Sequence, residues 1–123
     1  MSISQEEIQN EIAKAQQMQQ QLQNVISQKQ QLDMKSGDVD RALEELRKLD
    51  DDTPIFRNLG GDLLVKVKDR KELIEDLEDE LETLNVRVKS LSRQEEKLRK
   101  NFQELQQELT SKLSGMQGPM GGA

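Results

Sequence analysis

The sequence predicts a fold dominated by α-helix: a long antiparallel two-helix coiled coil with a single central β-hairpin, which joins a β-barrel formed between subunits. Three observations predict it. Apolar residues recur at heptad spacing in the first 50 residues and again after residue 69, and between these stretches Gly60-Gly61 separates two short apolar runs. We expect one domain over residues 1–123, divided into a helix over 4–50, a hairpin over 54–67, a second helix over 69–113 and a disordered tail over 114–123.

The first helix begins at a capping signal and continues through several heptads. Ser4, with Glu7 three residues later, matches a capping box. The seam, meaning the positions that face the partner helix, is then Ile8, Glu11, Ala15, Met18, Leu22, Val25, Lys29, Leu32, Ser36, Val39, Leu43 and Leu46. The helix is expected to end at Asp50–Pro54, because acidic groups oppose the dipole at a C-terminus and the residue before a proline avoids the α region.

Gly37 is the weak point of this helix. A glycine inside a helix costs about 1 kcal/mol relative to alanine, so a kink or fraying is one interpretation of Ser36-Gly37-Asp38. The heptad pattern continues in phase through this segment, which favours one uninterrupted helix.

The segment Thr53–Val67 lacks helical periodicity and is typical of a hairpin. Its two apolar runs contain β-branched and aromatic residues, and Gly60-Gly61 can supply the positive φ angles of a two-residue turn. With the turn at these glycines, one face of the ribbon is expected to carry Phe56, Leu63, Val65 and Val67. The other face is expected to carry Ile55, Leu59 and Leu64, together with Arg57 and Lys66.

The second helix is expected to begin after Asp69, which can cap it, with Glu72 at the third helical position. Its seam is more regular than the first: Ile74, Leu77, Leu81, Leu84, Val88, Leu91, Glu95, Leu98, Phe102, Leu105 and Leu109. The pattern ends near Leu113. The tail after it contains four glycines and a proline and is expected to be disordered.

Two arms of similar length joined by a hairpin are expected to pair antiparallel as one coiled coil. Such pairing brings Lys29 of the first seam close to Glu95 of the second. We interpret these residues as an ion pair that fixes the register of the helices, a role attested for polar residues in coiled-coil seams. The alternative is that each charged group extends separately to water.

The hairpin is expected to be the assembly element. A two-stranded ribbon is marginally stable in water, and both of its edges can pair with further strands. Both faces are apolar in part, so hairpins from several chains are expected to join in a shared sheet or barrel. The alternative is a hairpin that only caps the coil of a monomer. The candidate assembly residues are Ile55, Phe56, Leu59, Leu63, Leu64, Val65 and Val67.

Composition excludes several classes of function. The chain has no Cys and no His, so zinc clusters and Cys- or His-based catalysis are absent. A net charge of −6 argues against nucleic acid or an anionic membrane as the main partner. No apolar run approaches the roughly 20 residues of a membrane span, and no secretory signal is visible at the N-terminus. We therefore expect a cytoplasmic protein with no cofactor and no enzymatic activity.

The chain resembles the β class of prefoldin subunits over nearly its whole length. The resemblance is carried by the two long helices, by Pro54-Ile-Phe-Arg and Leu64-Val65-Lys66 in a single central hairpin, and by Arg93-Gln-Glu-Glu-Lys97 in the second helix. The spacing between Phe56 and Leu64-Val65-Lys66 is one residue longer than in the family pattern. A residue at or next to Gly61 is therefore inserted, which leaves the strand register and turn type open.

The resemblance implies a co-chaperone that works without ATP. Two α and four β subunits would form a hexamer through barrels built from their hairpins, and coiled-coil tips would capture non-native proteins and deliver them to a group II chaperonin. No phosphate-binding Gly-Lys-Ser/Thr loop occurs in the sequence, in agreement with this. A coiled-coil adaptor that binds a folded partner is the main alternative, and an RNA-binding helical arm is disfavoured by the acidic charge.

Under this resemblance the client-binding residues are apolar side chains near the tips of the arms. Flexible arms with exposed apolar groups suit weak, multivalent capture, and Met adapts to varied surfaces. For Ile8, Leu105 and Leu109 the rival role is packing in the seam. The candidates are Ile3, Ile8, Ile12, Leu105, Leu109, Leu113, Met116 and Met120.

Overall fold

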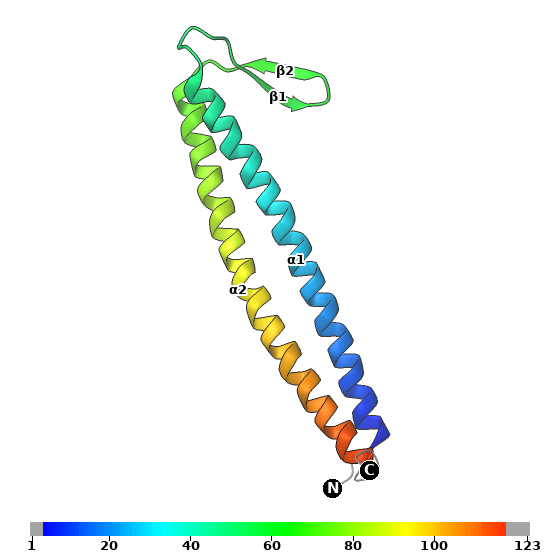
Figure 1. The fold of residues 1–123 in the computed structure, drawn as a ribbon. Coiled ribbons are helices and arrows are strands. Elements are labelled where there is room, and N and C mark those ends of the chain that lie inside the picture. Colours follow the sequence, from blue (N-terminus) through cyan, green and yellow to red (C-terminus); the bar gives the residue numbers. More distant parts are fainter. Residues whose placement is uncertain (1–3, 118–123) are drawn as a thin grey trace. The chain divides into compact units, whose positions relative to one another are not determined.

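Along the chain, one hairpin lies between two long helices, in the order α1, β1, β2, α2. In the computed structural model, which describes residues 4–117, α1 is Gln5–Lys48, β1 is Phe56–Gly60, β2 is Leu63–Lys66 and α2 is Arg70–Gln117 (Figure 1). Side chains are described as far as Gly115. The predicted order of helix, hairpin and helix is therefore confirmed.

The start of α1 follows the capping signal in the sequence. The Glu7 backbone N–H donates to the Ser4 hydroxyl oxygen at 3.1 Å, and the Ile8 N–H donates to the Ser4 carbonyl at 3.1 Å. The helix then continues without a break through Gly37. The cost of that glycine is spread over a helix held by its long seam, so tertiary packing outweighs the local propensity.

The end of α1 is capped by a residue that lies beyond the hairpin. The guanidinium group of Arg70 donates to the backbone carbonyls of Leu46, of Leu49 at 2.8 Å and of Asp50 at 2.9 Å. It also lies 3.7 Å from the Asp51 carboxylate. These contacts satisfy carbonyls that a helix leaves without partners, and they place a cation at the negative end of the helix dipole.

The second helix begins as predicted and ends later than predicted. The Glu72 N–H donates to Asp69 Oδ1 at 3.1 Å, which is the expected cap. The helix continues to Gln117, so the prediction of disorder from residue 114 is wrong for residues 114–117. Gly115 does not end the helix, because a single glycine within a helix costs only about 1 kcal/mol relative to alanine. The rest of the predicted tail, residues 118–123, lies outside the described residues.

Contacts along the chain group it into two units, and each helix contributes to both. The hairpin unit contains residues 30–89, and the terminal unit contains residues 1–29 and 90–123, of which 4–29 and 90–117 are described. In the hairpin unit, Val39 and Leu43 of α1 are buried against Leu84 of α2, and four further seam residues pack around them: Leu32, Ile74, Leu77 and Leu81. These are all positions of the two predicted seams.

Two ion pairs connect the helices along the exposed sides of the hairpin unit. Arg47 lies 3.3 Å from Glu78, and Lys35 lies 3.9 Å from Glu80. Both pairs are largely exposed, so each contributes little to the free energy of unfolding. Helix pairing in this unit therefore rests on the apolar seam.

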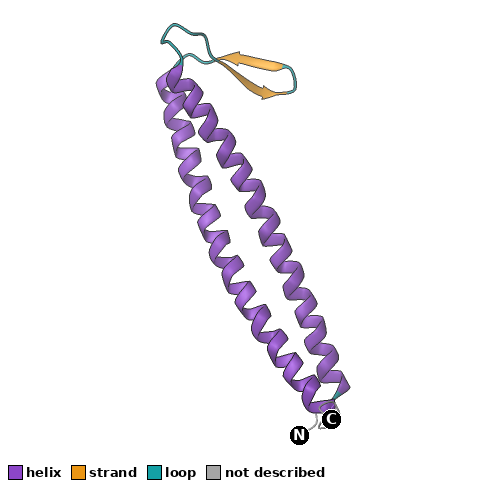
Figure 2. Ribbon diagram, viewed as in Figure 1, coloured by secondary structure: helices purple, strands orange, loops and turns teal. Residues whose placement is uncertain are grey.

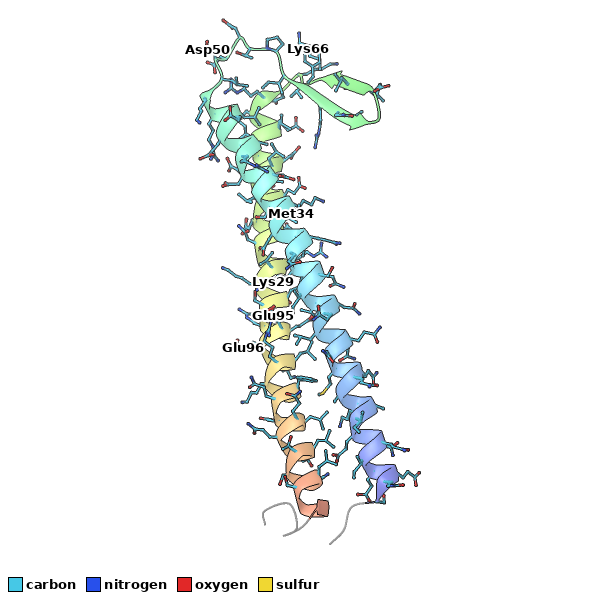
Figure 3. All side chains as sticks on the ribbon, turned by 45° about the vertical axis from the view of Figure 1, so that its right-hand side comes forward. Lys29, Met34, Asp50, Lys66, Glu95 and Glu96 are labelled. Carbon is cyan, nitrogen blue, oxygen red and sulfur yellow. The ribbon has the colours of Figure 1, made fainter. Side chains whose placement is uncertain are left out.

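The terminal unit has the same antiparallel seam, with charged residues in it. Ile8, Leu22 and Leu105 are buried. Lys29 Nζ lies 3.8 Å from Glu95 Oε2, so the structure brings the two predicted register residues together (Figure 3). Glu11 contacts Lys112, and Lys29, further along α1, contacts Glu95, which comes earlier in α2. This is the predicted antiparallel direction.

Figure 2 shows the two strands of the hairpin and the loop that joins them. Their register differs from the predicted one. Phe56 pairs with Lys66, Arg57 with Val65 and Asn58 with Leu64, and the register shifts by one residue at Leu59, so that Gly60 opposes Leu63. The turn is therefore formed by Gly61-Asp62 and not by Gly60-Gly61. Gly60 and Gly61 have φ angles of 133° and 56°, and the Gly60 N–H donates to Asn58 Oδ1 at 2.8 Å. Together these features form a bulge that places one extra residue in β1.

The bulge corrects the predicted faces of the ribbon. Because directly opposed residues point to the same side, one face carries Phe56, Asn58, Leu64 and Lys66. Arg57 and Val65 point to the other face, where Val67 also pairs with Ile55 through an N–H to carbonyl bond of 2.8 Å. The predicted grouping of Phe56 with Val65 is wrong, since a slip of one residue moves a side chain to the opposite face.

Lys29 and Glu95 should stabilise the helix pair as a unit. Their side chains are 27 % and 19 % exposed, so the attraction is screened less than at the surface. We expect a coupling of about 0.5–1 kcal/mol in a double-mutant cycle of Lys29→Met and Glu95→Leu, measured by urea unfolding. A matched cycle on the exposed pair Glu45 and Lys48 should give a coupling below about 0.5 kcal/mol. Additive effects at Lys29 and Glu95 would remove the proposed register role.

Replacement of Arg70 should weaken the end of α1. We expect Arg70→Met to lower the free energy of unfolding by about 1–2 kcal/mol, because several helix carbonyls lose a charged donor. Arg70→Lys keeps the charge but cannot reach the same carbonyls at once, so it should recover less than half of the loss. Urea unfolding followed by circular dichroism measures both variants. Full recovery with lysine would show that the charge, and not the hydrogen bonds, stabilises this helix end.

Candidate functional site

The hairpin carries the largest set of exposed apolar side chains in the described chain. Five residues, called here the hairpin surface, are 43 to 61 % exposed: Phe56, Leu59, Leu63, Leu64 and Val65. Ile55 and Val67, which complete the predicted assembly set, are half-buried where the strands approach the helices. A cluster of this kind on a protein surface indicates an interaction site, because isolated exposed residues are ordinary but contiguous apolar patches are not.

Neither the edges nor the faces of this ribbon are covered within the hairpin unit. The sheet has two strands, so each strand has an outer edge whose N–H and C=O groups can pair with another strand. An open hollow of about 290 Å³ lies between the ribbon and the first turns of α2, lined on the ribbon by Arg57 and Val65 and on the helix by Leu73 and Asp76. The helices of the hairpin unit therefore leave the ribbon's apolar groups without a full cover.

The second candidate site lies in the terminal unit, near the beginning of α1 and the end of α2. Ile8 and Leu105 are buried and Leu109 is half-buried, so these three have the seam-packing role that the sequence left open. Ile12 and Leu113 are 39 % and 40 % exposed. Ile3 and Met120 lie outside the described residues, as does the side chain of Met116. Ile12 and Leu113 are therefore the predicted tip residues whose exposed surface the structure describes.

The sequence reasoning missed an ion pair close to these two residues. Glu11 Oε1 accepts a hydrogen bond from Lys112 Nζ, which also lies 3.2 Å from Glu108. Hydrogen bonds to Glu11 and then to Glu108 raise the pKa of Lys112 above its ordinary value. The signal was present, since Glu11 occupies a seam position and Lys112 is the next heptad step after Leu109.

The described residues form no other arrangement with evident chemistry. Among residues 4–117, no group of three or more acidic side chains is placed to hold a metal ion. In the same part of the chain, no helix is apolar enough over a sufficient length to cross a membrane. The candidate sites are the two sets of exposed apolar side chains described above: the hairpin surface and the pair Ile12 and Leu113.

Comparison with known proteins shows the family to which the chain belongs. A family model described as prefoldin subunit matches residues 9–116. The prefoldin subunit beta of Archaeoglobus fulgidus is 46 % identical over 112 residues, which cover 91 % of this chain and 95 % of that protein. The prefoldin subunit beta of Thermoplasma volcanium is 34 % identical over 99 residues, 80 % of this chain and 79 % of that protein.

A solved structure agrees with the sequence comparison. The crystal structure of the prefoldin beta subunit from Thermococcus strain KS-1 aligns with a TM-score of 0.76 and 32 % sequence identity. The alignment covers 90 % of this chain and 96 % of that one. With one hairpin between two paired helices, and with relatives matched over most of their length, the chain belongs to the β subunits of the prefoldin family.

Proposed function

We propose that the chain is a subunit of an ATP-independent co-chaperone, which holds unfolded proteins and delivers them to a group II chaperonin in the cytoplasm. The proposal rests on family membership together with one observation. The largest exposed apolar surface of the described chain lies on an open-edged ribbon and not in a pocket with reactive groups. Such a surface supports assembly with other chains rather than catalysis, and the proposed subunit needs no cofactor.

The hairpin surface is the proposed assembly site. Strand pairing at the two free edges would satisfy backbone groups, and closure into a barrel would remove the edges altogether. Apolar side chains on both ribbon faces, with Phe56 and Leu64 on one and Val65 on the other, fit an environment that is covered on both sides. The proposed product is a hexamer in which two α-class and four β-class subunits are joined through their hairpins.

The terminal unit is the proposed client-binding site. Ile12 and Leu113 offer partly exposed apolar side chains, which suit contact with extended apolar segments of many sequences. Each contact of this kind is weak. Several tips that act on one client would raise the overall affinity by orders of magnitude, because the second and later contacts are intramolecular.

Assembly should depend on the hairpin surface and not on helix formation. We expect the chain, mixed with an α-class prefoldin subunit, to give the mass of the hexamer by light scattering coupled to gel filtration. The variant Leu64→Asp should stay in smaller species, because a charge would be buried in the barrel. Its helix content should equal that of the wild type, since Leu64 is exposed in the single chain. A hexamer formed equally well by Leu64→Asp would contradict the assembly role.

Protection of unfolded proteins should depend on Ile12 and Leu113. We expect Ile12→Ser with Leu113→Ser to weaken the suppression of aggregation severalfold, because both side chains offer apolar area to clients. The assay is light scattering of an enzyme diluted from guanidinium chloride in the presence of the assembled hexamer. The matched control is Met34→Ser with Val86→Ser, two residues of the hairpin unit that are 72 % and 60 % exposed (Figure 3 labels Met34).

The control variant should protect as well as the wild type, although it removes more exposed apolar surface. Equal protection by both variants and the wild type would contradict binding at Ile12 and Leu113. Absence of any protection by the wild-type hexamer would instead favour the alternative of a structural adaptor that binds a folded partner.

A further inference from the structure

In the terminal unit, charged residues occupy seam positions and the apolar residues next to them are exposed, which is the reverse of the usual coiled-coil arrangement. Glu11 and Lys112 occupy the seam and contact each other across it, whereas the next residue in each helix, Ile12 and Leu113, is apolar and exposed. A seam normally buries the apolar member of such a neighbouring pair and exposes the charged one. The same inversion occurs in both helices at the same level of the unit.

Helix geometry places the two displaced apolar residues together. Each residue advances about 100° around its helix, and the two helices run in opposite directions. From a pair of residues that face each other, one step along each helix therefore leads to the same side of the helix pair. Ile12 and Leu113 thus flank one side of the Glu11–Lys112 contact, with 39 % and 40 % of their surface exposed.

Two apolar residues are expected to stabilise this seam position more than the ion pair does. Glu11 Oε2 is buried, and no donor among the described residues reaches it. Desolvation of such a carboxylate opposes the attraction to Lys112, and replacing ion pairs of this kind by apolar residues is often stabilising. An exchange of the residues at positions 11 and 12, and of those at positions 112 and 113, would place apolar residues in the seam here. The observed order instead leaves two apolar side chains at the surface.

We propose that Glu11 and Lys112 are positioning residues for client capture: by occupying the seam they hold Ile12 and Leu113 at the surface, where extended apolar segments of unfolded proteins can contact them. This inference rests on the proposed function and adds to it the groups that present the binding surface. The charged pair also supplies attraction across the helices, so this level of the terminal unit stays paired without covering Ile12 and Leu113.

A composition-matched swap tests the proposal in the assembled hexamer. The variant Glu11→Ile, Ile12→Glu, Lys112→Leu and Leu113→Lys has the same composition and net charge as the wild type, but it restores the apolar seam. We expect its unfolding midpoint to rise by about 5 °C, because an apolar layer replaces a partly desolvated ion pair. The concentration needed to halve the aggregation of the unfolded enzyme should rise at least about fivefold, because the apolar binding groups are buried.

The second ion pair of the same seam provides a control. Lys29→Leu with Glu95→Leu also replaces a seam ion pair by two apolar residues, but neither position has an apolar neighbour displaced to the surface. This variant should also unfold at a higher temperature, and its protection should equal that of the wild type. Loss of protection in both variants would show that seam stability in general controls capture, and it would overturn the specific role of Glu11 and Lys112.

The remaining outcomes are distinct. A swap variant that protects as well as the wild type would overturn the positioning role and leave the proposed function intact. A swap variant that is both less stable and less protective would show that the ion pair is simply the better-packed arrangement, which also overturns it. A wild-type hexamer that fails to protect would refute the proposed function itself.

Discussion

Burial of a narrow apolar stripe between two antiparallel helices is the interaction on which the rest of the chain depends. Only 33 % of the residues are apolar, too few for a thick core, but enough for two stripes that cover each other. Val39, Leu43 and Leu84 form the buried centre of the hairpin unit, and Ile8, Leu22 and Leu105 continue the seam in the terminal unit. Helices of such polar sequence are stable in water because each covers the stripe of the other.

The hairpin differs from the seam because most of its apolar side chains are not buried within the chain. The seam uses most of the apolar residues of both helices, so the helices cover the ribbon only in part. Phe56 and Leu64 on one face and Val65 on the other stay exposed, and both strand edges remain open. The same scarcity of apolar residues that limits the helices to a narrow seam therefore leaves the hairpin surface exposed, which supports the proposal that the hairpin pairs with other chains.

Charged groups in the seam refine this arrangement instead of driving it. Lys29 and Glu95 form a contact of 3.8 Å between the helices, and Glu11 and Lys112 form another nearer the chain ends. Each pair gives up some apolar burial, and we propose that it gains specificity in return, because a shifted register would leave partly buried charges without partners. Arg70 has a related role at the junction: it joins the start of α2 to the end of α1 through the backbone carbonyls, so the hairpin departs from a fixed base.

The sequence by itself determined the two helices, their caps at Ser4 and Asp69, their antiparallel direction and the proximity of Lys29 and Glu95. These features follow from heptad spacing and local capping, which are properties of a periodic pattern. The apolar hairpin residues could also be named from the sequence, because composition alone marked them as too many for the helix ends to cover.

The tertiary structure alone decided the details where local signals were degenerate. The bulge at Leu59 moved the turn to Gly61-Asp62 and changed which side chains share a face, because two adjacent glycines allow several turns and pairing energy selects among them. The cap from Arg70 joins residues far apart in the sequence, and no local pattern encodes it. At Glu11 and Lys112, heptad position indicated that the charged side chains lie in the seam, but it could not show that they contact each other while Ile12 and Leu113 stay exposed. That choice depends on the balance between desolvation and pairing across two helices.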